Sequence, residues 1–234
     1  MPHKRFFSVI VPAHNEASVI EKTLGCLRDF AYPGDRYEII VVENGSTDAT
    51  YEKAKKFESR NCRILRSPKG VSRARNFGFN SAAPEMEWCL FLDADTFLGK
   101  NFLSELNDYL EKHPRVDYGT TTVHLDDTTV AGAFWSWYLN ATDKLIRIMH
   151  RVHIVRAELA RRVVYDENLV LSEDLRYSRD LSKFGNYFFM KTDSVVTSAR
   201  RFKSKGYVKM FFVNMITGLF PKKVLTKKDW EVIR

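Results

Sequence analysis

The sequence predicts an α/β fold in which helices cover a mostly parallel sheet. Over the first hundred residues, short apolar segments alternate with segments whose apolar residues recur with the period of a helix. This alternation is typical of strand–helix–strand units. With 234 residues, of which 44% are hydrophobic, the chain is large enough to bury a full core in one domain.

Four apolar segments of the first half are expected to be strands, namely 6–11, 37–42, 62–65 and 88–92. The first strand should stop at Pro12, because proline lacks the N–H that a sheet requires. Helices should follow the first three strands. We expect Asn15 to cap the first helix, the second to cover residues 49–58, and the third to run from an N-cap at Ser72 through residue 83.

The second half is less regular. Its threonine and valine content predicts a strand over 118–125, and shorter strands are expected over 184–190 and 194–197. Residues 131–162 are expected to be mainly helical and are rich in aromatic side chains. A further helix should run from about residue 172 through residue 181.

The positive charge is concentrated at the C-terminal end. The whole chain has a formal net charge of +8, and residues 200–234 alone hold ten Lys or Arg against two acids. Within this region, the apolar residues of 208–219 fall on one face of an expected helix. Such a basic amphipathic helix can lie on an anionic membrane surface, or it can pack on the protein. Nucleic-acid binding is the weakest alternative, and we expect no nucleic-acid partner.

The remaining composition favours a cytoplasmic protein, peripheral on the inner face of the cell membrane. Cys26, Cys62 and Cys89 are an odd number, and two of them lie in apolar stretches, which predicts reduced thiols. The chain starts without the apolar core of a signal peptide. No run of about 18 uncharged apolar residues predicts a membrane span.

Two carboxylates, Asp93 and Asp95, follow the apolar strand 88–92 and are separated by Ala94. Open parallel sheets bind ligands at the carboxyl ends of their strands. Because two adjacent acids repel each other, a divalent cation that bridges to phosphate oxygens is the natural ligand. The alternative is a simple turn after a strand.

Two more loops should lie at the same edge of the sheet; they contain Pro12, Ala13, Asn15 and Glu16 in the first, and Glu43, Ser46 and Asp48 in the second. Glu43 or Asp48 could bind a nucleobase, and Asp93 could bind a ribose hydroxyl, whereas helix capping is the simpler role of Ser46 and Asp48. Neither a dinucleotide-binding glycine pattern nor a P-loop is present. Phosphate charge should therefore be met by a metal and by basic side chains such as Lys69, Arg73 and Arg75, although an ion pair is an equal alternative for Arg75.

Candidates for the second substrate lie later in the chain. Glu173 and Asp174 begin the expected helix that runs through residue 181, where acids are common, but a carboxylate there could also deprotonate an attacking hydroxyl. Trp135 and Trp137 could contact a sugar ring, although core packing is favoured. His153 could assist the acceptor or be structural.

Five segments together resemble the signatures of family 2 glycosyltransferases, in the family's order and spacing: 6–16, 42–50, 70–78, 92–95 and 172–174. The resemblance covers about residues 6–202. It implies a GT-A fold, a nucleoside-diphosphate sugar donor, a divalent ion (Mn²⁺ or Mg²⁺) and transfer with inversion. It also assigns base recognition to Glu43, the ribose side of the donor to Asp93, the metal to Asp95 and the catalytic base to Asp174.

The sequence departs from the family pattern in three places. Segment 162–167 is bulkier and more basic than the Gly-Gly-Phe-Asp-Glu stretch of many members, no histidine follows Asp174, and the Gln-x-x-Arg-Trp signature of processive members is absent. Arg200 and Arg201 stand near the place of that signature, where they could reach the donor diphosphate or simply begin the basic tail. We therefore expect a non-processive catalytic domain over 1–202 and a basic amphipathic tail over 203–234.

The predicted function is transfer of a sugar from a nucleoside-diphosphate sugar to a hydroxyl of a saccharide or lipid-linked acceptor. Two alternatives stay open. In a polyprenyl-phosphate sugar synthase, a lipid phosphate would attack instead of a hydroxyl. A sugar-nucleotide-binding protein would hold the same donor without turnover.

Overall fold

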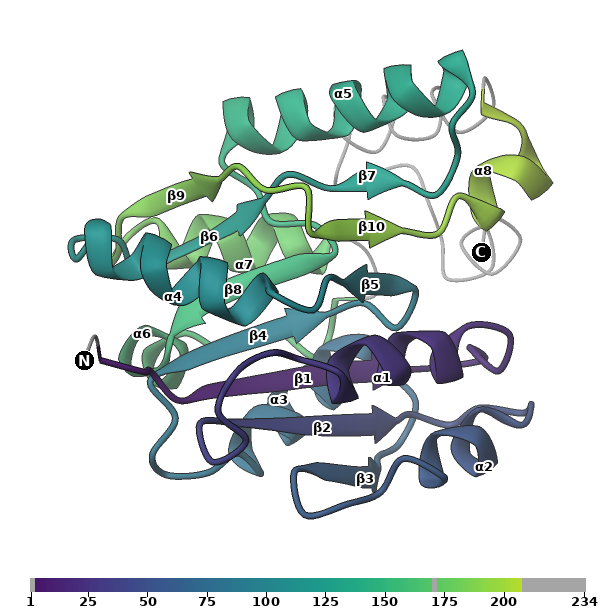
Figure 1. Cartoon of the computed structure of the whole chain (residues 1–234), viewed down its shortest axis with the longest axis horizontal. Helices are drawn as coiled ribbons and strands as arrows, with labels where there is room; N and C mark the ends of the chain where they lie inside the picture. The colour runs from purple at the N-terminus through teal and green to yellow at the C-terminus, as the bar shows by residue number, and fades with distance from the viewer. Residues whose placement is uncertain (1–2, 170–171, 208–234) are drawn as a thin grey trace.

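Seven strands form the central sheet of the computed structural model, which describes residues 3–169 and 172–207 (Figure 1). The strands of the protein are β1 (Phe7–Ala13), β2 (Tyr37–Glu43), β3 (Cys62–Arg66), β4 (Trp88–Leu92), β5 (Thr96–Leu98), β6 (Tyr118–Thr121), β7 (His124–Leu125), β8 (Val152–Arg156), β9 (Tyr187–Met190) and β10 (Val195–Thr197). The sheet has the order β3-β2-β1-β4-β8-β6-β9, and a smaller sheet has the order β5-β10-β7.

The central sheet is mainly parallel, which confirms the predicted class. β1 pairs in parallel with β2 and β4, β2 with β3, and β6 with β9. Only β8 runs against its neighbours β4 and β6. The carboxyl ends of β1, β2 and β4 therefore lie at one edge of the sheet, as ligand binding in open α/β sheets requires.

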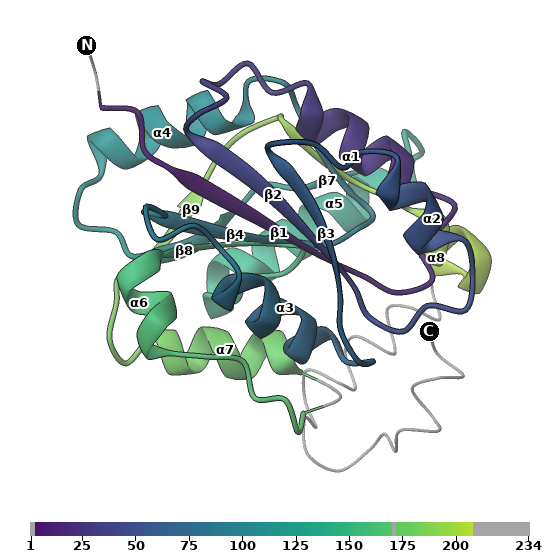
Figure 2. The ribbon, with the colours of Figure 1, turned by 90° about the horizontal axis from the view of Figure 1, so that it is seen from below.

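Helices cover both faces of this sheet (Figure 2). They are α1 (Ile20–Arg28), α2 (Thr50–Lys55), α3 (Val71–Asn80), α4 (Phe102–Lys112), α5 (Val130–Ile146), α6 (Ala157–Arg162), α7 (Glu173–Leu181) and α8 (Arg200–Lys205). α1, α2 and α4 lie on one face, and α3, α6 and α7 lie on the other. α5 packs beside the smaller sheet.

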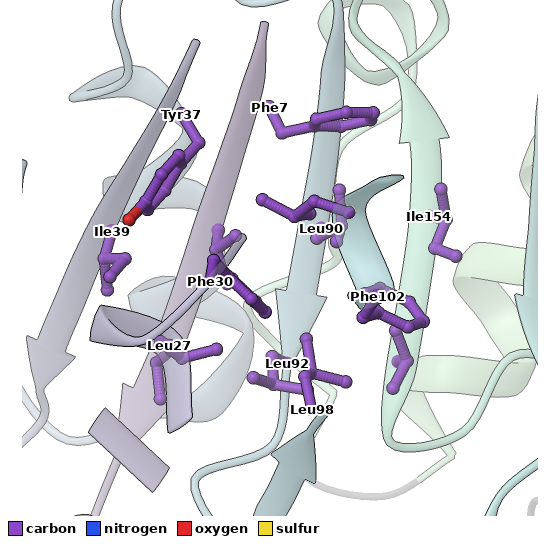
Figure 3. Packing of buried hydrophobic residues seen from close by; sticks show 14 of the residues in the cluster. Phe7, Leu27, Phe30, Tyr37, Ile39, Leu90, Leu92, Leu98, Phe102 and Ile154 are labelled. Atoms are coloured by element: carbon purple, nitrogen blue, oxygen red, sulfur yellow. The ribbon is translucent and has the colours of Figure 1, made fainter. Parts of the chain in front are cut away.

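Successive residues of each strand point to opposite faces, so the sheet separates two apolar cores. Val9 and Val11 of β1 pack in the core beneath α1 and α4, whereas Ile10 packs in the core beneath α3, α6 and α7. Figure 3 shows the first core, in which Leu27 and Phe102 reach the sheet from α1 and α4. Burial on both faces explains why the strands are continuous apolar runs.

The first strand extends past its predicted end. β1 continues through Pro12 to Ala13, and Pro12 is in register with Val42 of β2. The prediction that the strand stops at this proline is wrong. Because pairing of β1 with β4 ends at Ile10, the missing N–H of Pro12 removes no hydrogen bond from the ladder.

Two predicted helix caps are also wrong. α1 begins five residues after Asn15, and Asn15 Oδ1 instead accepts a hydrogen bond from Thr47 N at 2.9 Å. α3 begins directly after Gly70, whose φ of 144° suits only glycine. Ser72 lies buried in the first turn of α3.

The second half differs most from expectation. The region 131–162, predicted to be mainly helical, contains the central strand β8 between α5 and α6. The β-branched residues Val152, Ile154 and Val155 are fully buried there, which suits a central strand better than a helix. The strand predicted over 118–125 is two strands that belong to different sheets. β5 and α4 were not predicted.

The helix predicted over 208–219, and the basic tail from residue 208 onward, lie outside the described residues. Cys26, Cys62 and Cys89 are free thiols, and the last two are buried. Within 3–169 and 172–207, no helix combines the length and apolarity that crossing a bilayer requires.

Candidate active site

A cavity of about 790 Å³ lies at the carboxyl ends of the parallel strands. Its volume is in the range of small-molecule sites. Pro12, Asn44, Asp93 and Asp95 line it at the ends of β1, β2 and β4. α5, α7 and the segment after β10 supply the remaining walls. The three strand-end loops were predicted to meet at one edge of the sheet, and the structure has a ligand-sized cavity at that edge.

Arg75 of α3 holds three carboxylates together at the centre of this cavity. Its Nη1 donates to Asp174 Oδ1 at 2.6 Å, and its Nη2 donates to Asp93 Oδ1 at 3.2 Å. Glu173 Oε1 lies 3.6 Å from Nη1, and the guanidinium lies over the Tyr165 ring. Arg75 is only 2% exposed, so it is a buried ion-pair centre and not a surface pair. It joins the Asp93 loop to the start of α7.

The acids at the start of α7 differ in their electrostatic environment. Burial first, and then the charge of Asp174, raise the pKa of Glu173 to about 7, against the opposing charge of Arg75. Asp174 makes the shorter contact with Arg75. The carboxylates of Glu173 and Asp174 therefore differ in how closely they pair with the guanidinium of Arg75.

His153 lies buried behind Asp174, which favours its structural alternative over direct contact with an acceptor. It is fully buried on β8, its Nδ1 is hydrogen-bonded to the Tyr165 hydroxyl, and its Nε2 lies 3.5 Å from Asp174 Oδ1. Burial lowers the pKa of His153 well below its usual value, and Arg75 lowers it further. His153 is therefore a neutral support for Asp174.

Arg200 links the first loop to the Asp95 loop. It hydrogen-bonds Glu16, donates to Ser18 Oγ at 2.9 Å, and lies 3.6 Å from Asp95 Oδ2. Burial raises the pKa of Asp95, and the charge of Asp93 raises it further. Arg201 also lines the cavity, so the structure brings both predicted arginines to this side of the site. Ala94, between the two acids, lines it as well.

The second loop is held by its own carboxylates. Glu43 Oε1 accepts from Ser46 N at 2.5 Å, and Glu43 Oε2 lies 3.0 Å from Arg66 Nε. Asp48 Oδ2 accepts from Ala17 N at 3.2 Å. These predicted donor-binding acids therefore shape the loop from just outside the cavity wall.

Five other predicted donor contacts also lie outside the cavity lining: Ala13, Asn15, Ser46, Lys69 and Arg73. Asn15 N donates to Ser46 Oγ at 3.1 Å, which ties the first loop to the second. Arg73 Nε instead lies 3.2 Å from Glu167 Oε2. Lys69 packs against Gly45 of the second loop.

Trp135 and Trp137 point in different directions from α5, and neither lines the cavity. Trp135 is buried against Phe202 and Tyr207, which agrees with the core packing that was favoured for it. Trp137 is 65% exposed, and its contact with an acceptor stays a prediction. Tyr138 and Leu139 of the same helix line the cavity instead.

Sequence reasoning missed four basic residues that line the cavity. Arg147, Arg151 and Arg179 line it, as does His150. His150 Nδ1 lies 2.5 Å from Asp143 Oδ1. Burial lowers the pKa of His150, but the charge of Asp143 outweighs this effect and raises it overall.

Strained backbone is concentrated at the cavity. Asn15, Arg147, Arg151 and Ser172 are non-glycine residues with φ between 54° and 62°. The last three line the cavity, and Asn15 anchors its first loop. Such strain clusters at functional sites, where side-chain position outweighs backbone preference.

Fold and cavity together define an α/β protein with a ligand-sized cavity at the carboxyl edge of its sheet, the place where such folds bind ligands. The sequence profile described as "Glycosyl transferase family 2" matches residues 8–166, which is more than half of the chain. The chain therefore belongs to the family 2 glycosyltransferases.

Among named relatives, the chain is 39% identical over 94 residues to glycosyltransferase AglE of Haloferax volcanii, a match that covers 38% of this chain and 30% of AglE. It spans less than a third of the length of the first curated relatives that it matches.

Solved structures support the GT-A fold. Staphylococcus aureus TarS 1-349 in complex with UDP-GlcNAc superposes with a TM-score of 0.69 at 20% identity, covering 82% of this chain and 58% of that one. Mannosyltransferase PcManGT from Pyrobaculum calidifontis, in complex with GDP-Man and Mn²⁺, superposes with a TM-score of 0.64 at 20% identity, covering 99% of this chain and 68% of that one.

Proposed function

We propose that the protein transfers a sugar from a nucleoside-diphosphate sugar to an acceptor hydroxyl, with inversion at the anomeric carbon. The observation that carries this proposal is the bridge that Arg75 forms between Asp93 and Asp174. This bridge holds the donor-side carboxylate of Asp93 and the candidate base Asp174 in the wall of the same cavity. Family membership supplies the reaction class, and the bound nucleotide sugars of TarS and PcManGT support the donor class.

The donor would occupy the end of the cavity formed by Pro12, Asn44 and Asp93. Glu43 would contribute by fixing the Ser46 loop beside the nucleobase, since both of its oxygens already have partners. The carboxylate of Asp93 would accept from a ribose hydroxyl. Arg201, which lines the same wall, would contact the diphosphate.

The residues present fit a divalent ion at Asp95. The raised pKa of Asp95 shows that its charge is poorly solvated beside Asp93, and a nearby cation would relieve this. Mg²⁺ and Mn²⁺ favour such hard oxygen ligands and take further oxygens from substrate phosphates. In the described part of the chain, no three or more His, Cys, Asp and Glu side chains form a closed metal cage. When bound, the ion would supply stabilisation of the charge that develops on the leaving diphosphate.

Asp174 would be the base. Arg75 fixes its Oδ1, and Oδ2 accepts no hydrogen bond from any described residue. The free oxygen can therefore take the proton of the acceptor hydroxyl as that hydroxyl attacks the anomeric carbon. One base is sufficient, because attack opposite the leaving diphosphate inverts the configuration directly. His153 and Arg75 would position Asp174 without touching either substrate.

The test compares Asp174→Asn with Glu173→Gln, after a screen of UDP- and GDP-sugars for stabilisation on heating. We expect Asp174→Asn to lower turnover by about 10³-fold, within the range of lost acid–base catalysis, while donor affinity stays within threefold. Glu173→Gln should retain most of the turnover. Equal loss in both variants would refute the assignment of the base, and a wild type that binds no nucleotide sugar would refute the proposed function.

A further inference from the structure

Several cationic side chains that line the cavity are not paired with its acids. Six acids line it, and each lies within 4 Å of a cationic or protonatable side chain: Glu16 and Asp95 beside Arg200, Asp143 beside His150, and Asp93, Glu173 and Asp174 beside Arg75. Four other arginines also line it: Arg147, Arg151, Arg179 and Arg201. None of these four forms an ion pair with a described acid. The cavity is therefore prepared for an anionic ligand.

The four arginines belong to two ends of the cavity. The carbonyl oxygen of Arg151 accepts a hydrogen bond from Asp93 N at 2.9 Å, and Arg201 follows Arg200, which lies 3.6 Å from Asp95 Oδ2, so both belong to the donor end. Arg147 instead lies between Asp143 and Ile148, whose carbonyl oxygens accept from the Tyr187 hydroxyl of the far strand β9 at 3.0 and 3.5 Å. A donor diphosphate accounts for the first pair but not for the far end.

Arg179 approaches the same region from α7, because Ser178 Oγ of that helix accepts a hydrogen bond from Met149 N at 3.1 Å. It lies five residues after Asp174 and lines the cavity together with Ser178 and Ser182 of its own helix segment. The candidate base therefore lies between the donor end and this second basic end. An acceptor hydroxyl that reaches Asp174 would leave the rest of the acceptor near Arg147 and Arg179.

The backbone at Arg147 argues for a role of its side chain. Arg147 ends α5 in the left-handed region with φ 54°, a position that glycine occupies with less strain. Its charge also suits a helix C-terminus, but Lys144 already provides charge in the last turn. An arginine at this strained position is explained when its guanidinium binds something in the cavity.

We infer that the acceptor carries a phosphate or diphosphate group, which Arg147 and Arg179 bind at the end of the cavity opposite the donor. Guanidinium groups recognise phosphate through paired, charge-assisted hydrogen bonds. The inference rests on the proposed function and adds the chemical class of the acceptor. The group that attacks is still the hydroxyl beside Asp174.

The phosphate can belong to a lipid-linked or to a water-soluble acceptor. α5 exposes large apolar side chains, namely Val130, Phe134, Trp137, Leu145 and Ile146. Ile146 also lines the cavity, so this apolar surface continues to the cavity wall beside Arg147. A lipid chain would extend over α5, whereas a soluble phosphosaccharide would use the arginines alone.

The experiment measures binding of phosphate probes to the full chain saturated with UDP or GDP and Mn²⁺, so that the donor end is filled. The lipid probe is farnesyl phosphate in detergent micelles, with farnesol as its neutral match. The soluble probe is glycerol 3-phosphate, with glycerol as its neutral match. We expect at least one phosphate probe to bind tenfold or more tightly than its neutral match, and the tighter of the two probes identifies the source.

The variants separate phosphate binding from stability. Arg147→Gln/Arg179→Gln should weaken the tighter probe about a hundredfold or more, because each of the two lost charged contacts weakens binding about tenfold or more. Arg147→Gly should weaken it as well while relieving the backbone strain, so a loss of binding there is not a loss of folding. The control is Arg176→Gln, which removes the same charge from α7 at a residue paired with Asp180 and should leave probe affinity unchanged.

Probe binding that is equal to that of the neutral match, or unchanged in the double variant, would overturn the inference. Nucleotide affinity is measured on the same samples and should be equal in the wild type and all variants. If the wild type binds nucleotide but neither phosphate probe, only the inference of a phosphorylated acceptor is refuted. If the wild type binds no nucleotide, the proposed function itself is refuted.

Discussion

Arg75 Nη1 lies 2.6 Å from Asp174 Oδ1, although the two residues are 99 positions apart in the sequence. The guanidinium is almost fully buried and also contacts Asp93 and Glu173. A charge in such a place requires its partners, because an unpaired buried ion costs several kcal/mol. The contact therefore both positions Asp174 in the cavity and stabilises the folded protein.

Replacing Arg75 with Met should destabilise the protein by about 3–5 kcal/mol, since it leaves three carboxylates facing one another without a cation. Urea unfolding measures the change. Arg73→Met is the matched control, because its partner Glu167 is on the surface, and it should cost no more than about 1 kcal/mol. Equal stability of the two variants would show that the Arg75 contacts add nothing to the fold.

Glu173 should make stability depend on pH. Its pKa is about 7 in the folded protein against 4.5 for the free side chain, so the folded state binds the proton more tightly. The free energy of unfolding of the wild type should then fall as pH rises from about 4.5 to 7. Glu173→Gln removes this loss and should be more stable than the wild type at pH 8, by on the order of 3 kcal/mol.

At pH 4 the two proteins should have the same stability, because the carboxyl is then protonated in both the folded and the unfolded chain. Denaturant titrations at pH 4, 6 and 8 give the comparison. A difference that does not change across this range would mean that Glu173 is not the titrating group.

Two helix glycines should respond in opposite directions to alanine. A Cβ at Gly78 of α3 would lie 2.5 Å from Ile10 Cγ2 and 3.1 Å from Val42 Cγ2, so Gly78→Ala should destabilise by about 1–3 kcal/mol. A Cβ at Gly25 of α1 meets nothing within 4 Å, so Gly25→Ala should stabilise by about 0.5–1 kcal/mol. Thermal unfolding measures both, and changes of the same sign would contradict the described packing of α3 on the sheet.

Asp95→Asn should remove the dependence of donor binding on Mn²⁺. The amide keeps the shape of the side chain but loses the charge that would hold the ion, so donor affinity with Mn²⁺ should fall roughly ten- to a hundredfold. Calorimetric titration with and without the metal tests this. The exposed Asp193 provides the control variant Asp193→Asn, which should keep its Mn²⁺ dependence. Unchanged metal dependence in Asp95→Asn would place the ion elsewhere.

The edge of the sheet was predictable because strand ends are local features. Asp93 and Asp95 follow a strand whose apolar run is visible in the sequence, and parallel pairing then determines which loops meet. The role of Arg75 was not predictable in this way. Nothing near position 75 shows that Asp174 lies beside it, so an ion pair and a ligand contact were equally open.

The errors in the second half have a related cause. β8 is a five-residue strand between two helices, and its apolar residues fit either period over so short a length. On α5, Trp135 and Trp137 lie two residues apart, so they face different directions, and the sequence does not show which face meets the cavity. Tertiary packing decides both cases.

The central claim is that a nucleotide sugar occupies the cavity at the ends of β1, β2 and β4. A crystal structure with Mn²⁺ and the nucleoside diphosphate that most raises the melting temperature tests it most directly. We predict the nucleotide between Pro12 and Asp93, with its diphosphate and the ion at Asp95. A nucleotide bound elsewhere on the protein, with this cavity empty, would contradict the account.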